Sequence, residues 1–475
     1  MPDRSITDAN VLVLGIGILG GGQGVARYLR DSGANVRASD MRAESDFDPS
    51  MVAELRALGC ELHFGGHPNE DVDWADIVFR NPAVRQEAPI LVHAREAGKR
   101  IEMEIKFFAD RCRAPLIIVT GSKGKTTTTM LLRQLLDAGS GRRVAMAGNM
   151  GVSALAMLDS LTADDIALLE VSSFLLEEAP DGGWHPHVAV ITNVGDDHLD
   201  RYHHSMDEYR AVKVSVTLGQ TAGDWMVLPA WDDEILSATA ATPATRVLVH
   251  DARHDRGLSR ASHELFVAAG RFVATGFATD AVDLGRVDDL SLHGAHNATN
   301  FLFAAGAALA MGVDAAAIRD AVADLSPVSH RLEDIGTHRG LTFVDDTTAT
   351  APMAVVAALD ALPEVSAVVI CGGHDKGATF DPMVDALATR AAAVVALPGT
   401  GTDRFIDELR ARIEPSRLSM AESMADAVNV AIGLASAVGA TTVMLSPGCA
   451  SFGGFRNEFD RADQFRAAFQ EFSTP

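Results

Sequence analysis

The segment that most constrains the fold is residues 115–129, PLIIVTGSKGKTTTT, in which an apolar run meets a glycine turn and then a helix-like stretch. A strand that turns through glycines into a helix surrounds one point with unpaired N–H groups, and anions bind there. Gly121 and Gly124 let the backbone approach a phosphate, whose charge Lys125 can meet, and Thr126 can reach a bound magnesium. Two residues separate these glycines, fewer than usual. A threonine-rich turn is the alternative, but the Lys-Thr pair favours a nucleoside triphosphate.

Composition places the chain among soluble globular proteins with more than one domain. Its 475 residues exceed what one core can hold, and 47% hydrophobic with 22% charged residues excludes a disordered chain. The formal net charge of −24 argues against nucleic acid as the main partner, because backbone phosphates require contiguous basic surface. Solvated acidic surface is the simpler interpretation of that charge.

Cysteine usage and the N-terminal sequence predict a cytoplasmic protein. The cysteines show no paired spacing, so neither a zinc site nor a disulfide framework is indicated: Cys60, Cys112, Cys371 and Cys449. The first ten residues lack the apolar core of a signal peptide. Residues 427–445 are uncharged, but their glycines and threonines predict a helix, a turn and a buried strand rather than a membrane span.

The first block, residues 1–114, carries a second glycine turn. A predicted strand over residues 11–14 is followed by Gly15, Gly17 and Gly20, then by a helix over residues 23–32 and a strand that ends in Asp40. Glycines before a helix with an acid about twenty residues on are typical of sites that hold a diphosphate and a ribose hydroxyl. Close packing of helix on strand is the alternative. A substrate with its own nucleotide diphosphate would use this turn together with the phosphate loop.

Two further blocks alternate between strand-like and helix-like segments. Residues 115–325 contain predicted strands at 165–171 and 188–193 and a helix at 206–216, and residues 326–475 contain strands at 341–344, 367–371, 392–397 and 441–445. Apolar strands separated by helix-length segments indicate parallel sheets covered on both faces. The fold class predicted is three α/β domains.

Polar side chains follow two of the central strands. Glu170 closes the apolar run IALLEV, and a carboxylate there is unusual unless paired or metal-bound, so Thr126 and Glu170 could share one magnesium. A surface acid is the alternative. The next strand is followed by acids and by His198, a possible second metal ligand. Further histidines could form a metal cluster, although their polar and proline neighbours favour an exposed loop: His185, His187, His203 and His204.

The chain resembles the Mur ligase family, the ATP-dependent amide-forming enzymes of peptidoglycan precursor assembly. TGSKGKTT is similar to that family's shortened loop, and further elements follow in family order: GNMG at 148–151, EVSSFLLE at 170–177, NVGDDHLDRY at 193–202, EYRAVK at 208–213, GAHNATN at 294–300, HRLE at 330–333, DDTTAT at 345–350, GGHDKG at 372–377 and SPGCASF at 446–452. The SSF element and the Rossmann-like first domain are most similar to the member that adds D-glutamate to UDP-N-acetylmuramoyl-L-alanine.

The resemblance implies three domains: a Rossmann-like UDP-binding domain (1–114), a central ATP-binding domain (115–325) and a mobile, glutamate-binding C-terminal domain (326–475). It implies ATP and two magnesium ions, small-molecule substrates and a monomer. It assigns ATP to Gly121, Ser122, Lys123, Gly124, Lys125, Thr126, Thr127, Asn297, Arg331 and Asp346; the UDP substrate to Gly15, Ile16, Asp40, Asn149 and Ser172; and glutamate to Thr350, Lys376, Ser451 and Phe452. It assigns catalysis to Lys125, Glu170, His198 and Lys213, and metal to Thr126, Glu170, His198 and a carbamylated Lys213.

The chain departs from the family pattern near the amino-acid site. Thr348 and Ala351 stand where lysine and asparagine are usual, Leu175 stands where glutamine is usual, and FGGF follows Ser451. A related ligase that adds L-glutamate or another amino acid is therefore a second hypothesis. A non-enzymatic nucleotide sensor is a third, and the elements around Glu170, His198 and Lys213 argue against it, because a sensor needs no second metal site.

Overall fold

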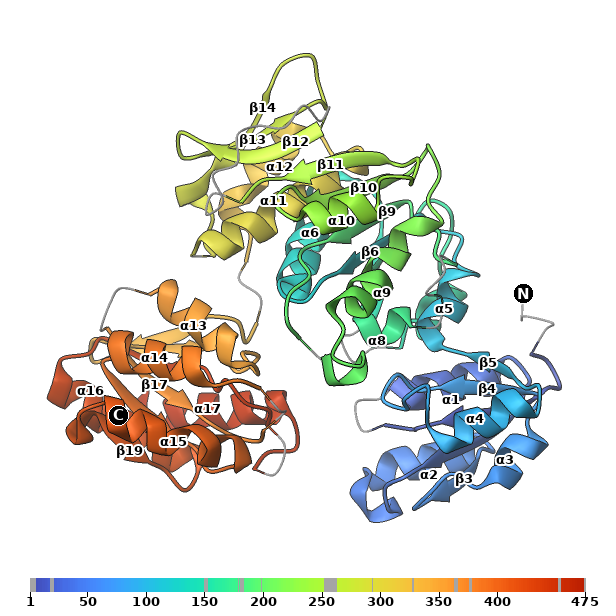
Figure 1. Cartoon of the computed structure of the whole chain (residues 1–475), viewed down its shortest axis with the longest axis horizontal. Coiled ribbons are helices and arrows are strands. Elements are labelled where there is room, and N and C mark those ends of the chain that lie inside the picture. Colours follow the sequence, from blue (N-terminus) through green and yellow to red (C-terminus); the bar gives the residue numbers. More distant parts are fainter. Residues whose placement is uncertain are drawn as a thin grey trace. The chain divides into compact units, whose positions relative to one another are not determined.

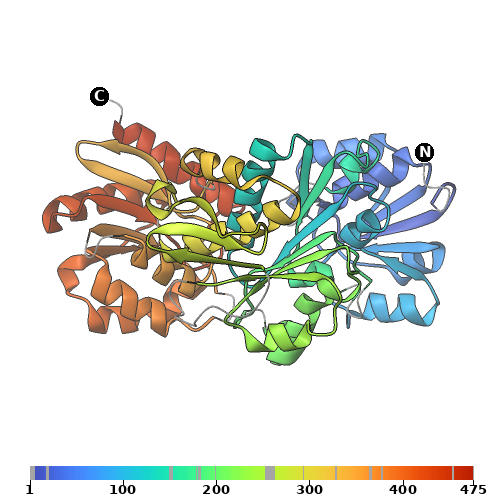
Figure 2. The ribbon, with the colours of Figure 1, turned by 90° about the horizontal axis from the view of Figure 1, so that it is seen from above.

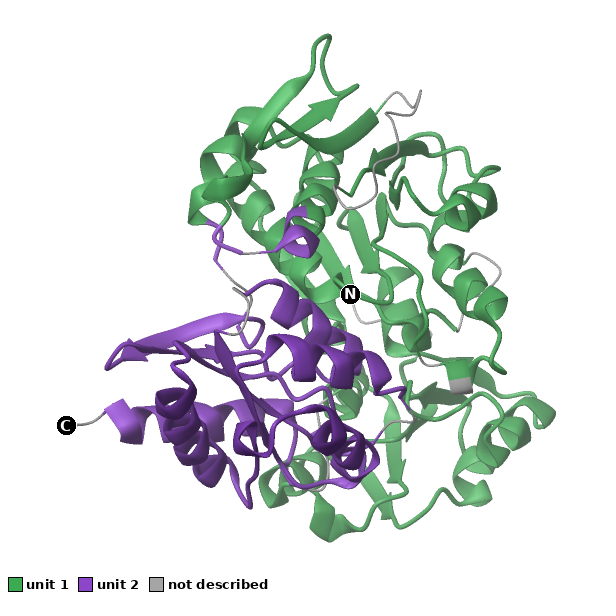
Figure 3. Ribbon diagram, turned by 60° about the vertical axis from the view of Figure 1, so that its left-hand side comes forward, with its two compact units in different colours: residues 1–290, 299–324 green, residues 291–298, 325–475 purple. Residues whose placement is uncertain are grey.

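A computed structural model describes residues 6–17, 21–148, 153–177, 179, 183–197, 199–251, 263–292, 294–326, 329–362, 366–375, 378–451 and 454–473. Three β-sheets follow one another along the chain (Figure 1). By their internal contacts the residues form two compact units, 1–290 with 299–324 and 291–298 with 325–475 (Figure 3). The predicted α/β class with three domains is confirmed, whereas the boundaries at 114 and 325 stay predictions.

The first sheet is parallel, with strand order β3-β2-β1-β4-β5. Its strands are β1 (Asn10–Leu14), β2 (Asn35–Asp40), β3 (Glu61–Phe64), β4 (Ile77–Arg80) and β5 (Arg100–Glu102). Its helices are α1 (Gly21–Asp31), α2 (Pro49–Ala57), α3 (Asn69–Trp74), α4 (Pro89–Glu96) and α5 (Glu104–Ala109). Alternate residues of β1 enter two apolar clusters, so both faces of the sheet are covered.

The central sheet has nine strands in the order β14-β13-β12-β11-β10-β9-β6-β8-β7. The strands are β6 (Leu116–Thr120), β7 (Val144–Gly148), β8 (Ile166–Glu170), β9 (Val188–Ile191), β10 (Trp225–Pro229), β11 (Thr245–Val249), β12 (His263–Ala268), β13 (Arg271–Thr275) and β14 (Val282–Arg286). Strands β6 to β12 are parallel, and β13 and β14 extend the sheet in antiparallel fashion. The sequence analysis did not anticipate this antiparallel extension, which turns through Ala269 and Gly270, both with positive φ.

The helices of this region carry much of the site. They are α6 (Lys125–Gly139), α7 (Leu155–Leu158), α8 (Ser173–Leu176), α9 (Met206–Leu218), α10 (Asp233–Ala238), α11 (Ala295–Ala310) and α12 (Ala315–Ala321). Ser205 caps α9, its side chain accepting from Glu208 N, and Asp207 and Glu208 place acids in the first turn. The predicted helix over residues 206–216 is therefore confirmed.

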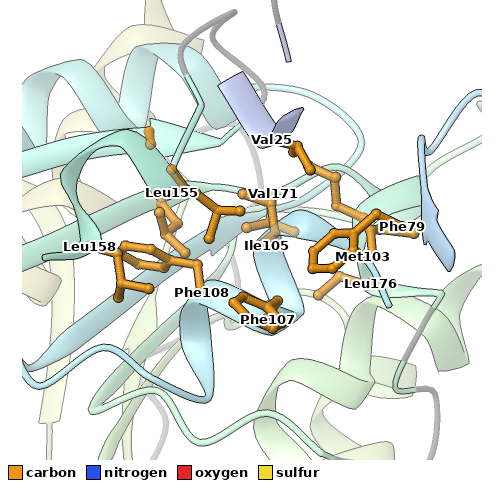
Figure 4. Packing of buried hydrophobic residues seen from close by; sticks show 14 of the residues in the cluster. Val25, Phe79, Met103, Ile105, Phe107, Phe108, Leu155, Leu158, Val171 and Leu176 are labelled. Atoms are coloured by element: carbon orange, nitrogen blue, oxygen red, sulfur yellow. The ribbon is translucent and has the colours of Figure 1, made fainter. Parts of the chain in front are cut away.

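The first and central sheets share one apolar cluster. Figure 4 shows this cluster, in which the rings of Phe79 of β4 and Phe107 of α5 are in contact and Val171 and Leu176 come from the central region. Burial of such side chains stabilises each by roughly 1.5–3 kcal/mol relative to exposure. This packing explains why both sheets belong to one compact unit.

The C-terminal sheet has the order β15-β16-β20-β17-β18-β19 and is parallel except for β15. Its strands are β15 (Glu333–His338), β16 (Leu341–Asp345), β17 (Ala367–Cys371), β18 (Ala393–Ala396), β19 (Leu418–Met420) and β20 (Thr442–Leu445). Its helices are α13 (Pro352–Asp360), α14 (Asp381–Arg390), α15 (Thr400–Arg412), α16 (Met424–Val438) and α17 (Glu458–Ser473). Alternate residues of β17 enter clusters with α13 to α15 and with α16 and α17, and helices cover both faces (Figure 2).

The uncharged stretch at residues 427–445 folds as predicted. It contains most of α16, then Gly439 in the left-handed region at φ +72°, then buried β20. None of the helices in the described ranges is both long enough and apolar enough to cross a bilayer.

Candidate active site

The phosphate loop lies between β6 and α6, as predicted. Gly121 and Gly124 have φ of +148° and +82°, in the region that favours glycine, and Gly124 is the N-cap of α6. A Cβ atom on Gly121 would overlap Thr192 Oγ1, and one on Gly124 would overlap Asn300 Oδ1. Both positions therefore require glycine, and the first amides of α6 lie at the helix N-terminus, where anions bind.

The end of β9 holds this loop in place. The Asn193 side chain makes two hydrogen bonds to the main chain of Lys123: Lys123 N donates to Asn193 Oδ1 at 2.9 Å, and Asn193 Nδ2 donates to Lys123 O at 2.9 Å. Thr192 Oγ1 donates to the same carbonyl at 2.6 Å. These three hydrogen bonds therefore fix the position of the Lys123 main chain relative to the end of β9.

Three lysines surround the loop. Lys125 Nζ folds back to donate to the carbonyls of Gly121 (2.9 Å) and Ser122 (3.0 Å). Lys213 Nζ also donates to Gly121 O, at 2.9 Å, and Lys123 Nζ pairs with Asp197 at 3.0 Å. Nitrogen donors from the loop itself, from α6 and from α9 thus meet around one glycine turn, an arrangement suited to several phosphate groups.

Lys213 is the most unusual of these lysines. Its side chain lies on α9, is 1% exposed, and places Nζ 4.7 Å from the centre of the Tyr209 ring. Burial, reinforced by the neighbouring Lys125, holds the pKa of Lys213 well below its usual value, against the opposing effect of Asp197. A neutral amine at this position is therefore favoured.

The carboxyl edge of the central sheet offers oxygen ligands for a cation. Glu170 ends β8 and pairs in register with Val119 of β6 and Gly148 of β7, one residue from the phosphate loop. Its side chain is buried, and Oε2 has no hydrogen-bond partner among the described residues. Such an oxygen, on the strand next to the one that leads into the phosphate loop, fits a hard cation such as magnesium. The predicted ligand His198 lies outside the described residues.

The second glycine turn brings Gly15, Ile16 and Asp40 together at the carboxyl edge of the first sheet. Gly15 N donates to Ser39 O at 2.8 Å, and Gly17 N donates to the Asp40 carboxylate at 3.1 Å. Ile16 lies between these glycines and is buried. Gly20, the third glycine of the predicted turn, lies outside the described residues, and nucleotide binding here stays a prediction. The predicted Asn149 lies outside the described residues, and Ser172 is the N-cap residue of α8.

His67 lies beside this turn and was not singled out from the sequence. Its Nδ1 lies 2.9 Å from Ser39 Oγ, and burial lowers the pKa of the ring despite the nearby Asp40. The segment between β3 and His67 contains two glycines with positive φ, Gly65 and Gly66. Gly66 N donates to Asp40 O, a contact that the sequence does not indicate.

Asp346 and Arg331, predicted to contact the nucleotide, lie close together in the C-terminal unit. Burial raises the pKa of Asp346 to about 7, although Arg331 opposes that shift. Ser446 Oγ donates to Asp346 at 2.7 Å, and Leu332 N donates to its other oxygen at 3.2 Å. Asn297, predicted to act with them, lies in the first turn of α11.

The loops that carry Thr350 and Ser451 also lie side by side, because Gly448 N donates to Ala349 O at 2.7 Å. Arg461 of α17, a fully buried residue that the sequence analysis did not identify, makes hydrogen bonds to both segments. Its guanidinium donates to Thr347 Oγ1 at 3.0 Å and to Cys449 O at 3.2 Å. The predicted Lys376 and Phe452 lie outside the described residues.

The histidines at 185, 187, 203 and 204 form no metal cluster within the described ranges. His185 contacts Gly219 O, His187 contacts Asp224, and His203 contacts Glu208. The described residues contain one possible metal group, made of His330, Glu333 and Asp345, in the C-terminal unit. Arg466 donates to both of its carboxylates, so an ion-pair network accounts for this group.

Sequence profiles of three Mur ligase domains match the chain in order: the MurD-like N-terminal domain at residues 9–102, the middle domain at 119–308 and the glutamate ligase domain at 330–449. A protein of Roseiflexus sp. strain RS-1, named UDP-N-acetylmuramoylalanine--D-glutamate ligase, is 39% identical over 97% of this chain and 98% of the relative. A protein of Symbiobacterium thermophilum with the same name is 35% identical, with the same coverage.

Solved structures give the same fold at lower identity. The UDP-N-acetylmuramate-alanine ligase MurC of Thermotoga maritima matches 98% of this chain and 100% of its own, with a TM-score of 0.61 and 21% identity. MurF of Acinetobacter baumannii matches 92% of this chain and 90% of its own, with a TM-score of 0.57 and 19% identity.

We expect Asn193→Ala to weaken nucleotide binding roughly tenfold, because two hydrogen bonds of about 0.5–1.5 kcal/mol each hold the loop. Calorimetric titration with ATP measures the change. Asn35→Ala is the control, since Asn35 makes an exposed side-chain hydrogen bond to Asn10 in the first sheet. Equal ATP affinity in the two variants would show that the loop keeps its shape without Asn193.

Proposed function

The chain belongs to the Mur ligase family, and from that membership we propose that it adds D-glutamate to UDP-N-acetylmuramoyl-L-alanine at the expense of ATP. The observation that carries the chemistry is the buried Lys213 amine, hydrogen-bonded to the same phosphate-loop carbonyl as Lys125. The relatives at 39% and 35% identity carry the name of the D-glutamate-adding ligase, which favours that amino acid over L-glutamate.

Each sheet receives one substrate in this proposal. Residues 1–114 bind the UDP group at the Gly15 turn and Asp40, and Asn149 and Ser172 reach its muramoyl-alanine part. Residues 115–325 bind ATP at the loop from Gly121 to Thr127. Residues 326–475 bind glutamate through Thr350, Lys376, Ser451 and Phe452, and Asn297, Arg331 and Asp346 complete the nucleotide site.

In the proposed reaction, a carboxylate oxygen of the alanine attacks the γ-phosphorus of ATP, and ADP leaves. The glutamate amine then attacks the carbonyl carbon of this acyl phosphate, loses a proton, and phosphate departs. Both steps concentrate negative charge, so the Lys125 ammonium and the amides of the glycine turn stabilise them electrostatically. Because an acyl phosphate hydrolyses in water, the site must also exclude solvent.

Magnesium fits the oxygen donors of the central site. Thr126 and Glu170 would hold one ion, and His198 with a carbamylated Lys213 would hold the second. Bound magnesium would neutralise phosphate charge and polarise the transferred group. The unpartnered Glu170 Oε2 supports the first assignment, and the buried Lys213 amine supports the second, because a carbamate forms only from a neutral amine.

The function is tested by ADP and phosphate release with UDP-N-acetylmuramoyl-L-alanine and a panel of amino acids, with mass analysis of the product. We expect turnover with D-glutamate and little with L-glutamate. Turnover with another amino acid would favour the second hypothesis, and the departures at Thr348 and Ala351 make the panel informative. Nucleotide binding without acceptor-dependent turnover would favour a sensor.

We expect Lys125→Ala to abolish phosphate release, because it removes the ammonium that folds over the phosphate loop. Calorimetric affinity for the UDP substrate should not change, since that ligand is assigned to the Gly15 turn and Asp40. Lys99→Ala, at an exposed lysine of the first sheet region, is the matched charge control. Parallel loss of turnover and UDP-substrate affinity would contradict this division of labour.

We expect Lys213 to bind CO2 as a carbamate at neutral pH. Because burial lowers its pKa, the amine keeps a larger neutral fraction than an exposed lysine does, and the carbamate should be lost as the solution is acidified and the amine becomes protonated. A carbonyl signal in ¹³C NMR after incubation with ¹³C-bicarbonate, absent from Lys213→Arg, measures it. An identical signal in that variant would place the carbamate elsewhere.

A further inference from the structure

A buried ion-pair network joins the first sheet to the central sheet. Arg80, the last residue of β4, has a fully buried side chain whose Nη1 lies 3.6 Å from the Glu177 carboxylate. Arg201 donates to both oxygens of that carboxylate, at 2.6 and 2.7 Å. The side chains of Glu177 and Arg201 are each 9% exposed. Charges removed from water to this degree need close partners, and here the partners come from two different sheets.

Additional contacts fix each member of the network. Arg201 Nη2 donates to Pro82 O of the first sheet region at 2.8 Å, and its guanidinium stacks 4.3 Å from the centre of the Phe174 ring. Arg80 Nη1 donates to Val84 O at 2.7 Å. Tyr202 OH donates to Glu177 at 3.0 Å. The guanidinium of Arg201 therefore bridges the two sheet regions, with one hydrogen bond to the first and two to the second.

Apolar packing continues directly from these charges. Phe79 and Leu176 immediately precede Arg80 and Glu177, and both belong to the cluster shared by the two sheets (Figure 4). The ion-pair network and this apolar cluster thus form one continuous contact between the two sheet regions, which we call the joint. A bidentate arginine–carboxylate pair adds directional restraint, which dispersion contacts alone supply poorly.

Site residues lie beside every segment of the network. Asn81 follows Arg80 and packs beneath the nucleotide turn, where a Cβ atom on Gly15 would approach Asn81 Cβ to 2.8 Å. Glu170 and Ser172 precede Glu177 in one continuous segment, and Arg201 follows Asp197, which pairs with Lys123 of the phosphate loop. The network therefore connects the segments that carry the proposed acceptor and triphosphate sites.

We propose that Arg80, Glu177 and Arg201 act as positioning residues that hold the acceptor site of the first sheet at a fixed distance from the phosphate site of the central sheet. This role rests on the proposed function, in which the alanine carboxylate of an acceptor anchored at Gly15 and Asp40 must reach the γ-phosphorus. A displacement of about 1 Å in a reacting group can cost a hundredfold in rate. Loss of the network should therefore lower kcat by a larger factor than it lowers the affinity for the UDP ligand or for ATP.

The test is Glu177→Gln, which keeps the shape of the side chain and removes the charge that two guanidinium groups share. We expect kcat for acceptor-dependent ADP release to fall roughly tenfold to a hundredfold, with less than a threefold change in calorimetric affinity for UDP or ATP. Arg80→Met should reproduce part of the loss. An unchanged kcat, or affinities that fall as far as kcat, would overturn the proposal.

Asp165→Asn is the matched control for lost stability. Asp165 also accepts two hydrogen bonds from one arginine, Arg143, at 2.9 Å to each oxygen. It directly precedes β8, at the end of that strand opposite to Glu170. We expect this variant to lower the melting temperature and to retain kcat. An equal loss of kcat in both variants, at similar melting temperatures, would attribute the effect of Glu177→Gln to general destabilisation and overturn the proposal.

Hydrogen exchange provides a readout that does not depend on the reaction. In Glu177→Gln, amides of residues 80–84 and 199–202 should exchange faster together, whereas Asp165→Asn should leave both segments unchanged. If the amides of residues 80–84 did not exchange faster in Glu177→Gln, the claim that Glu177 links the two sheet regions would be wrong. If wild-type protein shows no acceptor-dependent turnover with any amino acid while this exchange pattern holds, the proposed function fails and the joint between the sheets stands.

Discussion

The arrangement of the central site depends on parallel strands that end at the same edge of one sheet. Strand β6 lies between β8 and β9, so the phosphate loop, Glu170 and Asn193 emerge side by side although they are far apart in sequence. Helix α9 then adds Lys213 from a more distant segment. In open α/β sheets ligands bind at this edge, and here the edge presents nitrogen donors around the glycine turn and a buried acid next to it.

A second constraint is the continuous packing between the first two sheets. In the proposed function, two substrates bind to different sheet regions and must be brought together. The shared apolar cluster and the ion pairs among Arg80, Glu177 and Arg201 join the first sheet region to the central one. Three separate α/β blocks were evident from the sequence. The structure shows that two of them form one compact unit. The side chains that join them could not be identified from the sequence, because the spacing of apolar residues does not show which residues contact each other.

Much of the fold was predictable, because glycine turns and apolar runs are local signals. The strand that ends at Asp40 lies where the sequence placed it, the strand predicted at 165–171 forms as Ile166–Glu170, and a helix follows the glycine turn at Lys125. The antiparallel extension after β12 was missed, since a two-residue turn of Ala269 and Gly270 is a weak signal. In the site, residue types indicated phosphate and metal chemistry, and the resemblance supplied roles for individual residues.

Long-range contacts were beyond the sequence. The double hydrogen bond of Asn193 to the loop, the burial that lowers the Lys213 pKa, and the hold of Arg461 on two C-terminal loops all join segments that only the fold brings together. Arg461 was hidden for a simple reason. Helix α17 contains many charged residues, so its arginines are expected to be exposed to solvent. Only the structure shows that Arg461 is buried.

The carbonyl of Gly121 accepts hydrogen bonds from two amines at once, those of Lys125 and Lys213. A carbamate on Lys213 would carry a negative charge, so it would leave this carbonyl to Lys125 and present oxygens in place of a donor. The lining behind the glycine turn would then gain a negative charge that attracts a cation. Dissolved carbon dioxide would in that way decide whether the pocket accommodates a second divalent ion.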